Sequence, residues 1–255
     1  MSIYNKITNE KKKGYDAKVI ELPKNKKVNR KETHNKKIWL YGLPCSGKTF
    51  LANQFPNVLM LNTDGNIGQV DAPAIKIADE ITVDGRLTKR RYAWDVFKDT
   101  ILELEKQNND FETIVVDLLE DVYDACRIKV CIDNDWEHES DDSFKAYDIV
   151  RSEFLRTLKR LTNLNYNVIL ISHEDTSEDI TKKSGDKITA IQPNIKKKLA
   201  LKIAGMVDIT CRVVNDDGKR TINFKSSEVE FGGSRLDIQT NTIPCKYEKL
   251  MEVYA

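Results

Sequence analysis

Eight consecutive residues have the types and spacing that bind a phosphate group. They are Gly42-Leu43-Pro44-Cys45-Ser46-Gly47-Lys48-Thr49, and they match the pattern G-x-x-x-x-G-K-[ST] of a phosphate-binding loop. The apolar run 38–41 precedes the motif and the apolar turn 50–52 follows it, so the expected order is strand, loop and helix. Chance matches rarely have this context, and the motif therefore indicates nucleotide binding.

Each fixed position of the motif has a physical role. Gly42 and Gly47 permit backbone conformations in which successive N–H groups turn toward a bound phosphate. Lys48 is expected to contact the β- and γ-phosphates of ATP, and the hydroxyl of Thr49 is expected to coordinate Mg²⁺. The predicted nucleotide contacts are Gly42, Pro44, Cys45, Ser46, Gly47, Lys48, Thr49 and Phe50.

Two aspartates follow short apolar runs that are typical of buried strands. The run 57–62 leads to Asp64, and the run 111–116 leads directly to Asp117. An apolar strand that ends in an acid beyond a phosphate-binding loop is the Walker B pattern, in which the carboxylate helps to hold Mg²⁺. We therefore expect Asp117 to share the metal with Thr49; the alternative is that it caps the following helix. Asp64 lies at the sheet edge where open α/β sheets place their ligands.

A third apolar run, residues 166–171, ends in three polar residues, Ser172, His173 and Glu174. Such a strand end can present a side chain that senses the γ-phosphate. His173 is the best candidate, because an imidazole can donate a hydrogen bond to a phosphate oxygen and respond to its loss. A purely structural histidine is the alternative.

The remaining pattern predicts the elements that position these residues. Helical periodicity is present over 92–104, 118–130 and 146–164. Apolar and polar residues alternate over 206–214 and 220–225 around a turn, which predicts a C-terminal antiparallel hairpin. The chain is therefore expected to be an α/β protein with a mostly parallel central sheet flanked by helices.

Short strands are also expected at 75–77 and 81–83. The polar segment 176–189 contains Lys182, Lys183 and Lys187 and is predicted to form a hairpin or loop. Basic loops are one way in which ATPases hold DNA, so we expect this segment to contact single-stranded DNA. A solvated turn would explain the same residues.

Composition sets the domain organisation. A chain of 255 residues with 32% charged residues can form one large domain, expected over 36–255, after a lysine-rich N-terminal segment, 1–35. That segment is expected to be a solvated, partly disordered leader, with a short edge strand at Val19-Ile20 or a nucleic-acid contact as alternatives. The net charge is only +1, so overall charge does not indicate a nucleic-acid partner.

The cysteine pattern and the hydropathy of the chain indicate where in the cell the protein is located. Five cysteines are an odd number and form no C-x-x-C pair, which favours reduced thiols. Neither a secretory signal nor an apolar run long enough to cross a membrane is recognisable. We expect a cytoplasmic protein without a membrane partner.

The combined order of these features resembles the RecA-like ATPases carried by bacteriophages, often labelled phage nucleotide-binding or AAA-family ATP-binding proteins. The resemblance covers about residues 36–236 and rests on the stretches GLPCSGKT, VLMLNTDGN, TIVVDLLED and NVILISHED. It implies a RecA-like P-loop NTPase fold with ATP and Mg²⁺ as cofactors. Position by position, it implies phosphate and metal binding by Lys48 and Thr49, a Walker B role for Asp117, and a sensor near His173.

The chain departs from that family at Asp64, where RecA-like enzymes usually place a glutamate that polarises the attacking water. Aspartate is one methylene shorter, and a base misplaced by about 1 Å can cost on the order of 100-fold in rate. The expected hydrolysis is therefore slow or stimulated by DNA. Glu120, Asp121 and Glu174 are alternative bases.

The resemblance also implies partners. Some members act in recombination or replication on single-stranded DNA beside a single-stranded-DNA-binding or annealing protein, in the cytoplasm of the host cell. Subunits are expected to stack head to tail in a ring or filament, each supplying a cation to its neighbour's γ-phosphate. The candidate cations are Lys196, Lys197, Lys198, Arg212 and Arg235.

Two other function classes are compatible with a phosphate-binding loop. A nucleotide or small-molecule kinase is one, although the segment 128–150 lacks the arginine-rich lid that clamps a second phosphorylated substrate. A non-hydrolysing adaptor or loader, whose shape is set by bound ATP, is the other.

Overall fold

The computed structural model describes most of the chain, and every described residue up to 254 belongs to one compact unit, Thr33–Ala255. The described residues are 34–138, 140, 145–177, 179–181 and 187–254. The predicted N-terminal segment, with its strand at Val19-Ile20, lies outside them apart from its last two residues. Lys182 and Lys183 also lie outside, so their contact with DNA stays a prediction.

The secondary structure follows the expected order of strands and helices. The strands are β1 (Lys37–Gly42), β2 (Val58–Asn62), β3 (Ala74–Lys76), β4 (Glu80–Asp84), β5 (Leu87–Arg91), β6 (Thr113–Asp117), β7 (Asn167–Asp175), β8 (Asp179–Thr181), β9 (Lys187–Thr189), β10 (Gln192–Pro193), β11 (Ile209–Asp216), β12 (Lys219–Asn223), β13 (Gly233–Ser234) and β14 (Thr242–Pro244). The helices are α1 (Lys48–Ala52), α2 (Ala93–Glu105), α3 (Leu119–Asp133), α4 (Ala146–Thr162), α5 (Lys197–Ala204) and α6 (Tyr247–Glu252).

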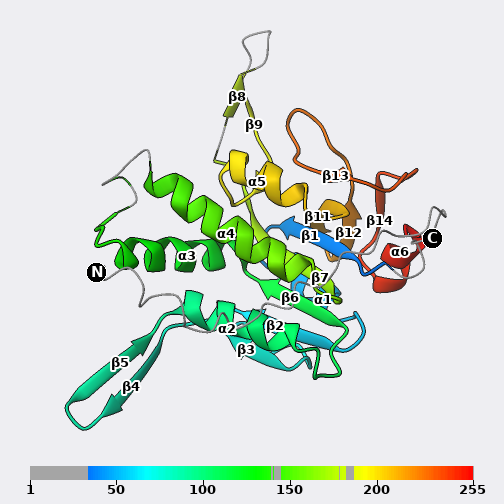
Figure 1. The fold of residues 1–255 in the computed structure, drawn as a ribbon. Coiled ribbons are helices and arrows are strands. Elements are labelled where there is room, and N and C mark those ends of the chain that lie inside the picture. Colours follow the sequence, from blue (N-terminus) through cyan, green and yellow to red (C-terminus); the bar gives the residue numbers. More distant parts are fainter. Residues whose placement is uncertain (1–33, 139, 141–144, 178, 182–186, 255) are drawn as a thin grey trace, which may run out of the picture. The chain divides into compact units, whose positions relative to one another are not determined.

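The central sheet has a parallel middle and an antiparallel edge (Figure 1). Its path among the described residues runs β14-β12-β11-β1-β7-β6-β2-β3, with β10 added to β7 and β13 to β11. All pairs from β11 to β3 are parallel, whereas β12 and β14 pair in antiparallel fashion. The strand that ends in the phosphate-binding loop therefore lies one strand away from β6, with β7 between them.

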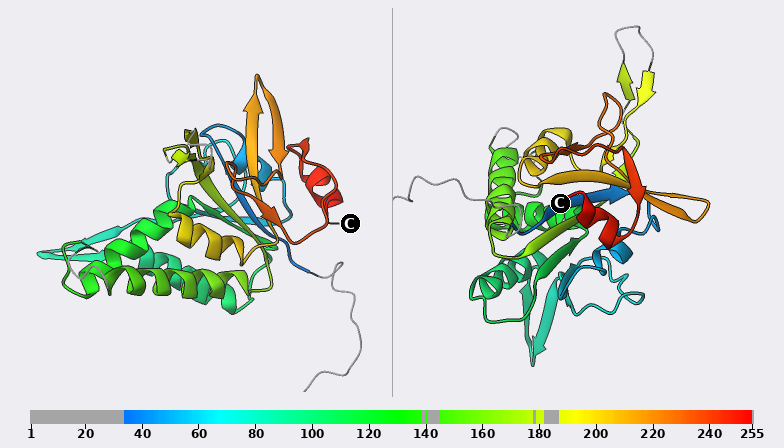
Figure 2. Two further views of the ribbon diagram at one scale, coloured as in Figure 1. Left: turned by 90° about the horizontal axis from the view of Figure 1, so that it is seen from above. Right: turned by 90° about the vertical axis from the view of Figure 1, so that its right-hand side faces the viewer.

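Helices cover both faces of this sheet (Figure 2). Every residue of β1, β2 and β6 is buried, as expected for strands covered on both sides. Because successive side chains point to opposite faces, Trp39 packs with α2, α3, α4 and α5, whereas Ile38 and Leu40 pack with α1 and α6. The prediction of a mostly parallel α/β sheet flanked by helices is confirmed.

A hydrogen bond in the core fixes neighbouring strands of the site. The indole Nε1 of Trp39 in β1 donates to the hydroxyl of Ser172 in β7 over 3.0 Å, and both residues are fully buried. This bond holds the strand end that carries His173 beside the strand that leads into the phosphate-binding loop.

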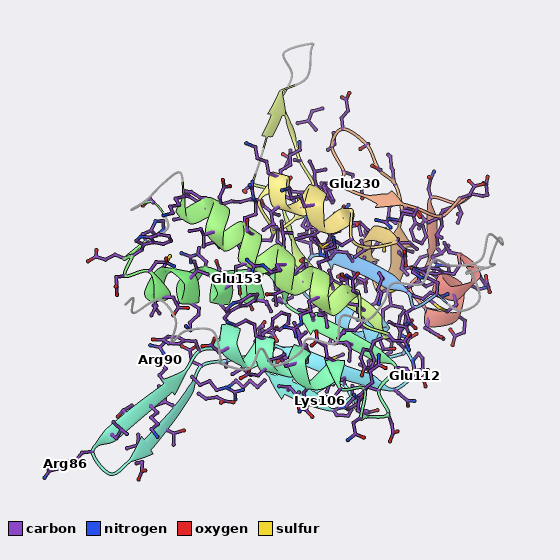
Figure 3. All side chains as sticks on the ribbon, viewed as in Figure 1. Arg86, Arg90, Lys106, Glu112, Glu153 and Glu230 are labelled. Carbon is purple, nitrogen blue, oxygen red and sulfur yellow. The ribbon has the colours of Figure 1, made fainter. Side chains whose placement is uncertain are left out.

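The β4–β5 and β8–β9 hairpins form small sheets of their own beside the central sheet. The β4–β5 hairpin is exposed along both strands, with Arg86 at its end and Arg90 nearer its base (Figure 3). Its first strand was expected at 81–83, but its second strand, Leu87–Arg91, was not. The β8–β9 hairpin confirms the hairpin that was one of the two structures expected within 176–189. Among the described residues, no helix has both the length and the apolar character needed to cross a bilayer.

Candidate functional site

The phosphate-binding loop joins the buried end of β1 to α1, as the motif predicts. Gly47 ends the loop with φ 105°, a left-handed conformation that glycine adopts without a steric cost. A β-carbon on Gly42 would lie 2.3 Å from the carbonyl oxygen of Val213 in β11. Gly47 is therefore needed for the turn of the loop, and Gly42 for the close approach of β1 to β11.

Lys48 is 5% exposed, and its ammonium group is directed at the loop itself. Its Nζ donates to the carbonyl oxygens of Gly42, at 2.9 Å, and Leu43, at 2.8 Å. Burial lowers the pKa of Lys48, and the nearby carboxylate of Asp117 opposes this shift. The cation thus lies inside the loop, hydrogen-bonded to neutral oxygen atoms, where an anionic phosphate would be a stronger acceptor.

Thr49 and Asp117 are in direct contact. The hydroxyl of Thr49 donates a 2.7 Å hydrogen bond to Oδ2 of Asp117, which is 4% exposed at the end of β6. Burial raises the pKa of Asp117, and the bond from Thr49 lowers it in part. Hard oxygen donors of this kind, one of them a carboxylate without a full countercharge, suit Mg²⁺. Both residues predicted to hold the metal are therefore placed where they fit it.

Asp64 follows β2 and accepts three hydrogen bonds from its own turn. Its Oδ1 accepts from the side chain of Asn62 at 3.0 Å and from the backbone N–H of Asn66 at 2.9 Å. Its Oδ2 accepts from the side-chain amide of Asn66 at 2.9 Å. Burial raises the pKa of Asp64, but the bonds from Asn66 and Asn62 together lower it below its ordinary value. The carboxylate is therefore ionised and held in a fixed orientation.

His173 forms a pair with Glu120, which lies in the first turn of α3. The ring Nδ1 of His173 is 3.2 Å from Oε1 of Glu120, and the same oxygen accepts the backbone N–H of His173 at 2.7 Å. Burial and the charge of Lys48 lower the pKa of His173. Burial raises the pKa of Glu120 to about 7, and its Oε2 is buried with no hydrogen-bond partner among the described residues.

A single hollow of about 730 Å³ brings these predicted residues together. It is lined by Pro44, Cys45, Gly47, Lys48, Thr49, Phe50, Asp64, Gly65, Asn66, Gly68, Gln69, Val70, Asp117, Leu118, His173 and Arg220. Gly42 and Ser46, predicted as nucleotide contacts, are buried and do not line it. A second hollow of about 600 Å³, formed by α2, α3 and α4, contains none of the predicted site residues.

The structure distinguishes the candidate cations for a neighbouring subunit. Arg212 donates twice to Glu174, at 2.7 and 2.8 Å, and its guanidinium is 3.5 Å from Glu230. The Glu174 side chain is only 3% exposed, so this pair is an internal contact of the chain. Arg212 is therefore removed from the candidates, and Glu174 from the alternative bases. Lys196, Lys197 and Lys198, at the start of α5, and Arg235 are exposed.

Arg220 is a charged residue of the hollow that the sequence did not predict. It lies in β12, within the predicted hairpin, and lines the hollow beside Gly47. Strand alternation indicates which face of the hairpin it occupies, but the position of that face over the loop depends on the strand order. No signal in the sequence alone identifies it.

The comparison with known proteins agrees with this geometry. No curated protein matches the sequence. The model of a family described as an AAA domain matches residues 34–236, which is well over half of the chain and includes every residue of the hollow. The chain therefore belongs to this AAA domain family and is a P-loop NTPase by sequence and by fold.

Proposed function

We propose that the protein is a Mg²⁺-dependent ATPase. The observation that carries this proposal is the bond between Thr49 and Asp117 beside the buried ammonium of Lys48, in a hollow of about 730 Å³. These groups can hold a triphosphate and its metal, and Asp64 and His173 line the same hollow. Membership in the AAA domain family supports nucleotide binding as the general activity.

The proposed mechanism assigns a role to each side chain. Lys48 exchanges its bonds to the carbonyls of Gly42 and Leu43 for bonds to the β- and γ-phosphates. Thr49 and Asp117 would hold Mg²⁺, which when bound neutralises charge that develops on the β- and γ-phosphate oxygens. Asp64 orients the attacking water and accepts its proton as the water oxygen forms a bond to the γ-phosphorus. The bond from that phosphorus to the β–γ bridging oxygen breaks and ADP leaves, while His173 contacts the γ-phosphate.

We further propose that this ATPase acts on single-stranded DNA in phage recombination or replication. Its protein partner would be a single-stranded-DNA-binding or annealing protein. One feature supports a link between nucleotide and DNA. The β8–β9 hairpin connects the end of β7 to β10, and β10 pairs with Glu174 and Asp175 of β7. His173 therefore directly precedes the paired segment of β7 and β10 from which this hairpin extends, so a shift of His173 could be passed on to the hairpin that is expected to hold DNA. A head-to-tail ring or filament of subunits belongs to the same proposal.

One observation supports a second function, that of a non-hydrolysing adaptor whose shape is set by bound ATP. Both carboxylate oxygens of Asp64 are occupied by donors of its own turn, and its pKa is lowered. A carboxylate with a low pKa is a weak base. If these bonds persist with ATP bound, the protein would hold ATP without rapid turnover and act through its shape.

Phosphate release from Mg·ATP, with and without single-stranded DNA, tests these functions together. Stimulation by single-stranded but not by double-stranded DNA is the expected result. Tight ATP binding without release in either condition would support the adaptor instead. Chromatography of labelled nucleotides would detect transfer of the γ-phosphate to a nucleoside monophosphate. Such transfer would contradict the ATPase proposal and support a kinase.

A further inference from the structure

Arg220 places a second cation of the same chain at the phosphate-binding loop. If Gly47 carried a β-carbon, that atom would lie 2.7 Å from Cδ and 3.0 Å from Nε of Arg220. The arginine stem therefore packs directly on the loop beside Gly47. Arg220 also lines the hollow that Lys48, Thr49 and Asp117 share.

The position of Arg220 is set by the sheet. β12 is bonded to β11 in a regular antiparallel register, with Asn215 opposite Arg220, and β11 lies directly beside β1. The carbonyl of Val213 in β11 closely approaches Gly42 at the start of the loop. The guanidinium is thus delivered by strands that are packed against the loop, and its approach does not depend on a separate domain.

Arg220 differs in its ion pairing from Arg212, the other arginine of the β11–β12 hairpin. Arg212 in β11 forms ion pairs with Glu174 and Glu230. Within the part of the chain that the structure describes, the Arg220 side chain has no carboxylate within ion-pair distance and no hydrogen bond. An unpaired guanidinium in a hollow that is also lined by Lys48 favours a bound anion.

The strand order indicates which end of the nucleotide Arg220 faces. The metal-binding acid, Asp117, and His173 come from β6 and β7, on one side of β1. Arg220 comes from β12, on the other side of β1. A phosphate chain with its terminal group at Asp117 and Thr49 would therefore direct its nucleoside end toward Arg220.

We infer that Arg220 binds the α- and β-phosphates of a nucleoside di- or triphosphate, as a cation supplied by the same subunit; this rests on the proposed nucleotide site. ATP and ADP both carry an α- and a β-phosphate. Arg220 should therefore raise the affinity for both nucleotides by similar factors.

Isothermal titration of ADP and ATP in the presence of Mg²⁺ tests the inference. Arg220→Ala should lower the affinity for both nucleotides by about 10-fold, which corresponds to the loss of one charge-assisted hydrogen bond. Arg220→Lys should recover part of this loss because it restores the charge. Lys219→Ala is the matched control, since Lys219 precedes Arg220 in β12 and is likewise exposed but does not line the hollow. This variant should bind both nucleotides as the parent does.

Each other outcome is informative. Unchanged affinities in Arg220→Ala would overturn the inference, as would a loss for ATP without a loss for ADP, which would place the contact at the γ-phosphate. Equal losses in Arg220→Ala and Lys219→Ala would show a general effect of charge or of hairpin stability. If the parent protein itself bound neither nucleotide, the proposed function would fail, and that result is distinct from a failure of Arg220 alone.

Discussion

The hydroxyl of Thr49, in the first turn of α1, donates a 2.7 Å hydrogen bond to the carboxylate of Asp117 at the end of β6. The two residues are 68 positions apart in the sequence, and in the sheet β7 lies between β6 and the strand that leads into the loop, β1. This bond joins the phosphate-binding loop to the buried acid. It is the contact on which the proposed metal site depends.

Asp117→Asn should remove the dependence of nucleotide affinity on Mg²⁺. The asparagine can still accept the bond from Thr49 but carries no charge for the metal. Titration of ADP with and without Mg²⁺ should show a difference in the parent and none in the variant. The free energy of unfolding without nucleotide should not fall, because the variant removes a carboxylate whose pKa is raised by burial.

Asp121→Asn provides the comparison for that experiment. Asp121 is a nearby carboxylate that accepts a 2.7 Å bond from Thr63 and does not line the hollow. It should keep the Mg²⁺ dependence of the parent. A Mg²⁺ dependence that survives in Asp117→Asn would show that the metal is held elsewhere.

Asp64→Asn should slow hydrolysis by about 100-fold, as expected for the loss of a general base, while ATP binding stays within about 2-fold of the parent. Steady-state phosphate release and equilibrium binding measure the two quantities. Asp71→Asn, an exposed residue of the loop between β2 and β3, should change neither. Equal losses of binding and turnover in Asp64→Asn would instead assign Asp64 to the structure of its turn.

Glu120→Gln should alter how stability depends on pH. Burial raises the pKa of Glu120 from 4.5 to about 7, so the folded protein binds this proton more tightly than the unfolded chain. The resulting contribution, roughly 3 kcal/mol at most, is fully present below about pH 4.5 and is lost as the pH rises through about 7. The glutamine does not titrate, but its side-chain oxygen can still accept the backbone N–H of His173.

Urea unfolding between pH 5 and 8 measures this difference. The parent should lose more stability over that interval than Glu120→Gln does. Glu103→Gln, an exposed glutamate of α2, should follow the parent. Identical pH profiles for the parent and Glu120→Gln would show that the carboxylate is ionised throughout and that its buried environment accommodates the charge.

The sequence predicts those parts of the site that local patterns encode. The phosphate-binding loop and the strands that end near Asp64, Asp117 and His173 all appear where apolar runs and polar breaks place them. The fold class follows from the same alternation of strands and helices. Local patterns suffice here because each of these residues lies at or just beyond the end of the buried part of a strand.

The unpredicted features depend on long-range packing. Leu87–Arg91 has one apolar residue in five, so its pairing with β4 has no periodic signal. The ion pair between Arg212 and Glu174 joins β11 to β7 across β1. Arg220 reaches Gly47 for a related reason, since the order of β12, β11 and β1 in the sheet brings the two together. Strand order is a property of the whole chain, and no local pattern specifies it.

Release of phosphate from Mg·ATP by the parent and by Lys48→Ala tests the central claim most directly. The claim requires the parent to release phosphate and the variant to release it about 100-fold more slowly or worse. This factor corresponds to the loss of two charge-assisted hydrogen bonds of about 1.5 kcal/mol each. Lys202→Ala, an exposed lysine of α5, should retain the activity of the parent. Equal phosphate release by the parent and by a folded Lys48→Ala protein would contradict the claim that this loop holds the triphosphate.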